Sequence, residues 1–218
     1  MVAALPLEFA GIPSRPAPLR GVWSHSAGLG PHHAFLVANG AGTHRAAAAF
    51  DAALSVFRPD AVVSTGFCGA LAPHFQVADI VVGTAAGPHP AQPVASDRPH
   101  HTGPVSTIDH VAQTAAEKRR LAAAGAIAVD MEASGVAARA QAMSLPFYCI
   151  KAVTDLAGEN LANDLNKALR PDGHFATILL LRGLLRHPWV RLPELVRLRN
   201  RSTRAARSLG EFLADCRY

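Results

Sequence analysis

Val129-Asp130-Met131-Glu132-Ala133 sets carboxylates among apolar residues. Further along the chain, a second run does the same: Lys151-Ala152-Val153-Thr154-Asp155. Glu132 lies in an alanine-rich stretch, and Asp155 ends an apolar run that predicts a buried strand. A carboxyl group against an apolar wall is desolvated, so its proton affinity rises and it can act as a general acid near neutral pH. Alternatively, Asp130 or Glu132 caps a helix and Asp155 opens a turn. The two runs in this order favour a catalytic pocket.

The length and composition of the chain fit a single compact α/β domain. The chain has 218 residues, of which 50% are hydrophobic, so it can bury a sizeable core. No apolar stretch approaches the roughly 18–20 residues of a membrane span, and the first residues lack a signal-peptide pattern. The cysteines Cys68, Cys149 and Cys216 are widely spaced and form no C-x-x-C motif, as in a reduced cytosolic protein. We therefore expect a cytoplasmic protein.

Positive charge is concentrated at the C-terminal end of the chain. From Arg182 onward nine arginines stand against three acidic residues, whereas the preceding part is nearly neutral. Leucines and Trp189 alternate with these arginines. This composition suits an amphipathic helix at an anionic membrane surface, and the alternative is a helix packed on the domain with its arginines in solvent. No motif or aromatic stacking platform indicates nucleic-acid binding.

Apolar runs alternate with alanine-rich stretches up to residue 154. The apolar runs predict strands at residues 34–38, 61–65, 79–84 and 147–154, and the alanine-rich stretches predict helices at 44–57, 109–124 and 131–143. Residues 86–104 predict a long surface loop, and the chain beyond Asn160 is expected to be helical with breaks at Pro171, Pro188 and Pro193. This alternation predicts a largely parallel sheet covered by helices on both faces. Ligands bind such sheets at the carboxyl ends of strands, where Asp155 falls.

Two glycine turns, Gly40-x-Gly42 and Gly66-x-x-Gly69, follow predicted strands. Glycine lets backbone amides approach a ligand, and amides at a helix N-terminus favour an anion, although turn sterics alone also select glycine. The pairs His32-His33 and His100-His101 lack the i, i+4 spacing of zinc enzymes, and no nearby cysteine or histidine set completes a site. The sequence thus predicts neither a metal site nor a cofactor.

With these segments in order, the chain resembles the nucleoside phosphorylase and nucleosidase superfamily, which includes methylthioadenosine/S-adenosylhomocysteine nucleosidase. The matching segments are Asn39-Gly40-Ala41-Gly42, residues 65–73, residues 79–82, Val129-Asp130-Met131-Glu132-Ala133 and Val153-Thr154-Asp155. A closer resemblance is to the hopanoid-associated phosphorylase branch, thought to remove adenine from adenosylhopane. It rests on residues 103–105, 117–118, 128–134 and 145–147 and on the arginine-rich C-terminal end.

The resemblance implies a fold and a domain organisation. We expect a single-domain, three-layer α/β fold in which helices flank a central mixed, largely parallel sheet. The catalytic domain is expected over residues 1–170, followed by a helical, arginine-rich extension over residues 171–218. Only Met1 to Ala4 precede the turn that carries Glu8, so either the first strand is very short or the assigned start is late.

The resemblance also implies a role for each matching residue. Asp155 protonates N7 of the purine, Glu132 binds the ribose 2′- and 3′-hydroxyls, Met131 packs beneath the sugar, and Glu8 orients and deprotonates the attacking water. Carboxylates near the ribose stabilise the positive charge that builds on the sugar as the glycosidic bond breaks. Further substrate contacts are expected at Gly66, Phe67, His110 and Thr154, and contacts to the nucleophile or to an anion at Gly40, Gly42 and Arg45.

Departures from the family pattern bear on the nucleophile. Members that use phosphate commonly carry an arginine near the N-terminal turn and an arginine with a serine around the second glycine turn, where this chain has Glu8, Ser64 and Phe67. The residues therefore favour hydrolysis of an adenine nucleoside with an apolar 5′ substituent. Phosphorolysis with inorganic phosphate as co-substrate, methylthioadenosine/S-adenosylhomocysteine nucleosidase activity and nucleoside binding without catalysis remain alternatives.

The resemblance implies partners as well. Relatives are usually dimers or hexamers in which a neighbouring subunit closes the 5′ side of the pocket, so we expect a homo-oligomer. An apolar substrate and the arginine-rich end together favour a cytoplasmic protein at the periphery of the inner membrane.

Overall fold

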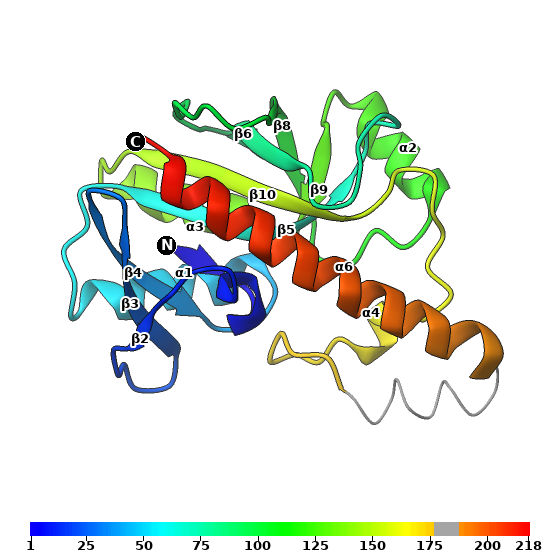
Figure 1. Cartoon of the computed structure of the whole chain (residues 1–218), viewed down its shortest axis with the longest axis horizontal. Coiled ribbons are helices and arrows are strands. Elements are labelled where there is room, and N and C mark those ends of the chain that lie inside the picture. The colour runs from blue at the N-terminus through cyan, green and yellow to red at the C-terminus, as the bar shows by residue number, and fades with distance from the viewer. Residues whose placement is uncertain (177–187) are drawn as a thin grey trace.

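The structure is a computed structural model that describes residues 1–176 and 188–218 (Figure 1). At its centre, β5 (Val62–Ala70) and β10 (Phe147–Asp155) pair in parallel. Alternate residues of β10 enter two separate cores, with Phe147, Cys149 and Val153 on one face of the sheet and Tyr148, Ile150 and Ala152 on the other. Burial on both faces explains why this strand is a continuous apolar run.

The sheet is mixed and closes on itself on one side of β5. β10 pairs with β6 (Ile80–Ala86), and the order continues through β8 (His101–Thr107) and β9 (Ala128–Asp130) back to β5. On the other side of β5 follow β1 (Val2–Ala3), β4 (His32–Ala38), β3 (Trp23–Leu29) and β2 (Arg15–Pro16), and β7 (His89–Pro90) pairs with β6. Parallel pairs such as β1–β5 and β6–β8 occur beside antiparallel pairs such as β3–β4 and β6–β10.

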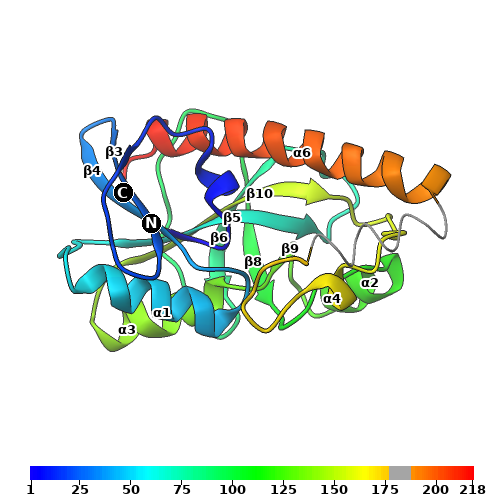
Figure 2. The same ribbon diagram turned by 90° about the horizontal axis from the view of Figure 1, so that it is seen from below.

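Helices cover both faces of this sheet, as Figure 2 shows. α1 (Thr43–Leu54) and α3 (Ala133–Ala142) pack against each other on one face, and the long α6 (Pro188–Asp215) runs over β10 on the other. α2 (Ala115–Ala123) and the short α4 (Leu165–Ala168) lie near the carboxyl ends of β5 and β10, and the 3-10 turn η1 (Pro6–Phe9) packs against α6. The expected α/β fold with a mixed central sheet between helices is confirmed.

Several element boundaries differ from the predicted ones. β5 continues through Gly66 and Gly69, so the second glycine turn lies within a strand. The predicted loop at 86–104 contains β7 and the start of β8, and the predicted helix at 109–124 begins only at Ala115, after its cap Thr114. The apolar pattern does not predict β1, β2, β3 or β9, because these strands are very short or rich in small polar residues. β1 has two residues, Val2 and Ala3.

The C-terminal part of the chain is folded onto the same sheet. α6 continues through Pro193, where a break was expected. Pro193 is the sixth residue of this helix, and without a backbone N–H it cannot make the hydrogen bond to the carbonyl of residue 189. Further along, Ala205, Leu209 and Phe212 of α6 are buried in the core that contains one face of β10. These contacts hold the helix in place.

The boundary expected between residues 170 and 171 stays a prediction. Part of the arginine-rich run, with Arg182, Arg186 and the leucines between residues 179 and 185, lies outside the described residues. Among the helices that the structure describes, none is long and apolar enough to cross a membrane.

Candidate active site

A cavity of about 480 Å³ lies at the carboxyl ends of β5 and β10. Its wall is built by η1, the ends of β5, β9 and β10, and residues of α4 and α6. The predicted site residues that line it are Glu8, Phe67, His110, Met131, Glu132, Thr154 and Asp155. Most of the remaining wall is apolar, with Leu7, Leu161, Leu165, Phe175 and Leu198 among its residues. The fold thus brings most of the predicted site residues to one cavity.

Glu8 is held by backbone amides of two different elements. It is buried in η1, where Oε2 accepts a hydrogen bond from Leu5 N (2.7 Å) and Oε1 accepts one from Phe67 N of β5 (2.7 Å). A Cβ on Gly66 would lie 2.5 Å from Glu8 Oε1, so glycine at position 66 makes room for the carboxylate. Burial raises the pKa of Glu8, although the two amides and the Lys151 ammonium oppose the rise. Both carboxylate oxygens therefore have a set orientation.

Glu132 lies at the N-terminus of α3 and points towards the first glycine turn. Its Oε1 accepts a hydrogen bond from Gly42 N (3.1 Å), and its Oε2 accepts one from Met131 N (3.3 Å). Burial raises the pKa of Glu132 to about 8, and the neighbouring Asp130 carboxylate adds to the rise. Burial therefore disfavours the ionised form of Glu132.

Asp130 and Lys151 form a buried ion pair with an Nζ–Oδ2 distance of 2.7 Å. Burial lowers the pKa of Lys151, but the adjoining Asp130 more than offsets this, so the pKa is raised. Asp130 also accepts hydrogen bonds from Thr107 Oγ1 (2.7 Å) and from Ala133 N at the start of α3 (2.9 Å). The helix-cap interpretation therefore holds for Asp130. The role of Lys151 was not predicted, although a single lysine in an otherwise apolar strand is a sequence signal for such a pair.

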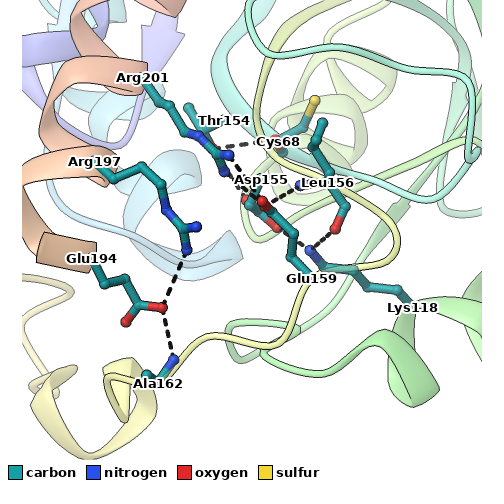
Figure 3. Close-up of polar contacts among 10 residues, drawn as sticks. All are labelled: Cys68, Lys118, Thr154, Asp155, Leu156, Glu159, Ala162, Glu194, Arg197 and Arg201. Carbon is teal, nitrogen blue, oxygen red and sulfur yellow. Dashed lines mark hydrogen bonds and ion pairs between the residues drawn. The ribbon is translucent and has the colours of Figure 1, made fainter. Parts of the chain in front are cut away.

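Asp155 ends β10 at a bulge, where Thr154 is the extra residue in the pairing with β5. A Cβ on Gly69 would lie 2.9 Å from Asp155 Oδ2, so glycine is again needed beside a carboxylate. Lys118 of α2 forms an ion pair with Oδ2, and Thr154 Oγ1 donates a hydrogen bond to Oδ1 (3.2 Å). Figure 3 shows these three residues. Asp155 therefore has a cationic partner that the family resemblance does not imply.

His110 lines the cavity with both ring nitrogens engaged by carboxylates. Nδ1 lies 2.7 Å from Asp109 Oδ1, and Nε2 lies 2.6 Å from Glu117 Oε1. The hydrogen bond with Asp109, followed by that with Glu117, raises the pKa of His110. A contact of His110 with the purine stays a prediction.

The first glycine turn supports Glu132, because the amide of Gly42 donates to that carboxylate. The Arg45 guanidinium donates from Nη2 to Pro171 O (3.0 Å) and is not among the residues that line the cavity. The anion-binding roles of Gly40, Gly42 and Arg45 therefore stay predictions. Across residues 1–176 and 188–218, no three histidine, cysteine or carboxylate side chains gather as a metal ion would require.

The helix α6 adds wall residues that were not predicted. Leu198, Arg199 and Ser202 line the cavity together with Leu161 and the other apolar residues named above. The three residues of α6 lie in the expected extension, residues 171–218. The composition of that segment gave no signal that it would face the site.

A mixed α/β sheet with carboxylates around a cavity at its strand ends is typical of an enzyme that acts on a small molecule. The family model described as "Phosphorylase superfamily" matches residues 3–92 and 91–179. The chain belongs to this superfamily and is an N-ribosyl hydrolase or phosphorylase. The superfamily resemblance of the sequence is thereby confirmed.

Solved structures share the fold over nearly the whole chain. The 5′-methylthioadenosine/S-adenosylhomocysteine nucleosidase of Helicobacter pylori has a TM-score of 0.69 and 15% identity, covering 97% of this chain and 93% of its own. The futalosine hydrolase of the same organism has a TM-score of 0.69 and 14% identity, with the same coverage. The nucleosidase of S. pneumoniae has a TM-score of 0.64 and 20% identity, covering 98% of this chain and 96% of its own.

Proposed function

We propose that this protein hydrolyses the N-glycosidic bond of an adenine nucleoside whose 5′ substituent is apolar, as in adenosylhopane. The observation that carries the proposal is the convergence of three carboxylates, Glu8, Glu132 and Asp155, on one cavity from distant parts of the chain. Two of them, Glu8 and Glu132, are buried and oriented by backbone amides. Such an arrangement suits a reaction that builds positive charge on a sugar.

The proposed reaction gives each carboxylate one task. Water attacks C1′ of the ribose and passes a proton to Glu8, while the C1′–N9 bond breaks and Asp155 passes a proton to N7 of adenine. Glu132 accepts hydrogen bonds from the ribose 2′- and 3′-hydroxyls, and Met131 packs beneath the ring. A positioned acid or base of this kind contributes roughly 10²–10⁴-fold to the rate.

The apolar part of the cavity wall supports an apolar 5′ substituent. Leu161 and Leu165 come from the segment around α4, Phe175 follows it, and Leu198 comes from α6. These side chains gain from excluding water, so a hydrocarbon or thioether substituent fits them better than a charged one.

Hydrolysis is favoured over phosphorolysis because Glu8 occupies the nucleophile side of the proposed site. A phosphate ion placed against the Glu8 carboxylate would be repelled unless a cation lay between them. The guanidinium of Arg45, the predicted anion ligand, is directed instead to the carbonyl of Pro171.

The experiment that tests the proposal is incubation of the full chain with adenosine, methylthioadenosine and adenosylhopane, with and without phosphate. Chromatography would measure free adenine and separate ribose products from ribose 1-phosphate products. We expect adenine release that does not need phosphate, with kcat/KM rising as the 5′ group becomes more apolar. Release that requires phosphate would establish phosphorolysis instead, and binding without adenine release would establish a nucleoside-binding protein.

The acid is tested by Asp155→Asn, which should lower adenine release roughly 10²–10⁴-fold. Asp164→Asn is the matched control, because Asp164 is a surface aspartate whose ion pair with Lys167 lies outside the cavity. An undiminished rate in Asp155→Asn would remove Asp155 from the mechanism.

The proposal extends to partners. We propose a homo-oligomer in the cytoplasm in which a second copy completes the 5′ side of the cavity, and contact of α6 with an anionic membrane surface from which an apolar nucleoside is taken. The contact is supported by the exposed side chains of Trp189, Val190, Leu192 and Val196, which lie among arginines.

A further inference from the structure

Among the residues that the structure describes, Lys118 is the one lysine that forms an ion pair with the proposed acid, and its side chain is fully buried. Within the described chain, its ammonium forms an ion pair with Asp155 Oδ2 and donates a hydrogen bond to Leu156 O (2.8 Å), as Figure 3 shows. The next residues of α2, Arg119 and Arg120, are exposed. The helix thus turns one cation inward to the acid and the next two outward to solvent.

The turn after Asp155 is held from a second side by α6. Leu156 N donates to Glu159 Oε2 (3.0 Å), and Glu159 forms two hydrogen bonds with the Arg201 guanidinium, at 2.7 and 2.9 Å (Figure 3). Both backbone groups of Leu156 are therefore occupied by side-chain contacts. With the turn fixed in this way, the Asp155 carboxylate is positioned by its own partners, Lys118 at Oδ2 and the Thr154 hydroxyl at Oδ1.

We infer that Lys118 is a positioning residue that holds the Asp155 carboxylate at the cavity wall and stabilises it once its proton has passed to the base. The inference rests on the proposed function, because it needs Asp155 to transfer a proton. Its physical basis is the buried ion pair: once Asp155 has given its proton to N7, the carboxylate left behind faces an ammonium in a poorly solvated place. The ion pair of the structure is the state that Asp155 regains once its proton has passed to N7. Because an ammonium interacts more strongly with a carboxylate than with the protonated acid, it lowers the barrier to this transfer more than it helps substrate binding.

Other charged or titratable groups also surround Asp155. They are Cys68 of β5, Glu159 after β10, Arg201 of α6, and Glu8, Asp130, Glu132, His110 and Arg199 on the wall of the same cavity. Among these, Arg201 has its guanidinium engaged by Glu159, and His110 has both ring nitrogens engaged by Asp109 and Glu117. Lys118 is therefore the cation whose removal should act most directly on Asp155.

The test compares Lys118→Met and Lys118→Arg with the full-length wild type in the adenine-release assay. Lys118→Met should lower kcat about 10²-fold with a much smaller change in KM, the size of loss seen for a transition-state hydrogen-bond donor. Without the ammonium, the carboxylate that forms as the proton leaves has no charged partner. Lys118→Arg keeps a cation at this position and should recover part of kcat. Arg119→Met is the control, and it should match the wild type.

If the Lys118→Met protein does not fold, Lys118→Gln replaces it, because glutamine keeps hydrogen-bond donors and carries no charge. An uncharged variant with the wild-type kcat would overturn the inference, as would a loss confined to KM. An inactive wild type would instead count against the proposed function, so the two failures can be told apart.

Discussion

At the scale of single residues, two glycines are required by the carboxylates beside them. Gly66 lies within β5 at φ +120°, and a Cβ there would come 2.5 Å from Glu8 Oε1 and 2.8 Å from its Cδ. Because Glu8 is held by two short amide hydrogen bonds, it cannot give way without losing them. The conformation and the close approach both exclude a side chain at position 66.

We therefore expect Gly66→Ala to lower the rate of adenine release about as much as Glu8→Gln, roughly 10²–10⁴-fold. Gly28→Ala is the matched control, because Gly28 also lies in a strand and its added Cβ would meet nothing within 4 Å. Steady-state kinetics with circular dichroism would check both variants. A folded Gly66→Ala protein with wild-type turnover would show that Glu8 needs no fixed orientation.

The pKa of Glu132 predicts how stability depends on pH. Burial, helped by the Asp130 carboxylate, raises this pKa from its ordinary value of 4.5 to about 8, so between these values the folded state binds more protons than the unfolded state. The contribution of Glu132 is therefore fully present below pH 4.5 and is lost as pH rises towards about 8. The pKa of Glu8 is also raised by burial and acts in the same direction.

Thermal unfolding at pH 5 and pH 8.5 would measure this dependence. The Tm of the wild type should fall from pH 5 to pH 8.5. The Tm of Glu132→Gln should fall less, because glutamine carries no charge at either pH. The two proteins should be closest at pH 5 and furthest apart at pH 8.5. A constant Tm difference between them would mean that Glu132 is already ionised at pH 5.

At the scale of elements, the cavity depends on how α6 holds the turn that follows β10. Arg201 of α6 binds Glu159 through two hydrogen bonds, which lower the pKa of Glu159 to about 2. Glu159 in turn accepts the amide of Leu156, the residue next to Asp155. A change on α6 should therefore reach the proposed acid through the backbone.

Arg201→Gln should reduce kcat about 10-fold, because it frees the turn without removing a group from the cavity. Arg207→Gln on the same helix is the control, since Arg207 pairs with Glu211 at the surface and is largely exposed. Hydrogen exchange at Leu156 should rise in Arg201→Gln and stay unchanged in Arg207→Gln. Unchanged hydrogen exchange at Leu156 together with a reduced kcat would contradict the proposal that Arg201 acts on Asp155 through Glu159 and the backbone of Leu156.

The same elements explain what the sequence could and could not predict. β10 was predicted almost to the residue, because a strand buried on both faces is a continuous apolar run ending at Asp155. β5 was cut short, because Gly66 and Gly69 resemble a turn in sequence, although their role is to admit the carboxylates of Glu8 and Asp155. Lys118 was placed in a helix without a contact, because no local pattern shows which side of α2 faces the cavity.

At the scale of the whole molecule, charge and apolar surface meet on the outer side of α6. Trp189 is 91% exposed, and Val190, Leu192 and Val196 are each more than half exposed. Arg197 and Arg204 lie on the same part of the helix and are exposed. Glu194 is buried, accepts hydrogen bonds from Ala162 N and Asn163 N, and forms an ion pair with Arg197 at 3.6 Å. This surface therefore presents positive and apolar groups with its one acid turned inward.

An anionic bilayer complements such a surface, and Leu198 of the same helix lines the cavity, so docking there would bring an apolar nucleoside close to its site. We expect the full chain to co-sediment with vesicles that contain phosphatidylglycerol and to do so less in high salt. Each arginine near the surface contributes about 1 kcal/mol, so Arg197→Gln with Arg204→Gln should weaken binding roughly 30-fold. Arg119→Gln with Arg120→Gln removes the same charge from α2 and should leave binding unchanged. An equal loss of vesicle binding in both double variants would mean that net charge, and not the α6 surface, attracts the protein to the bilayer. Equal binding to neutral vesicles would exclude electrostatic docking altogether.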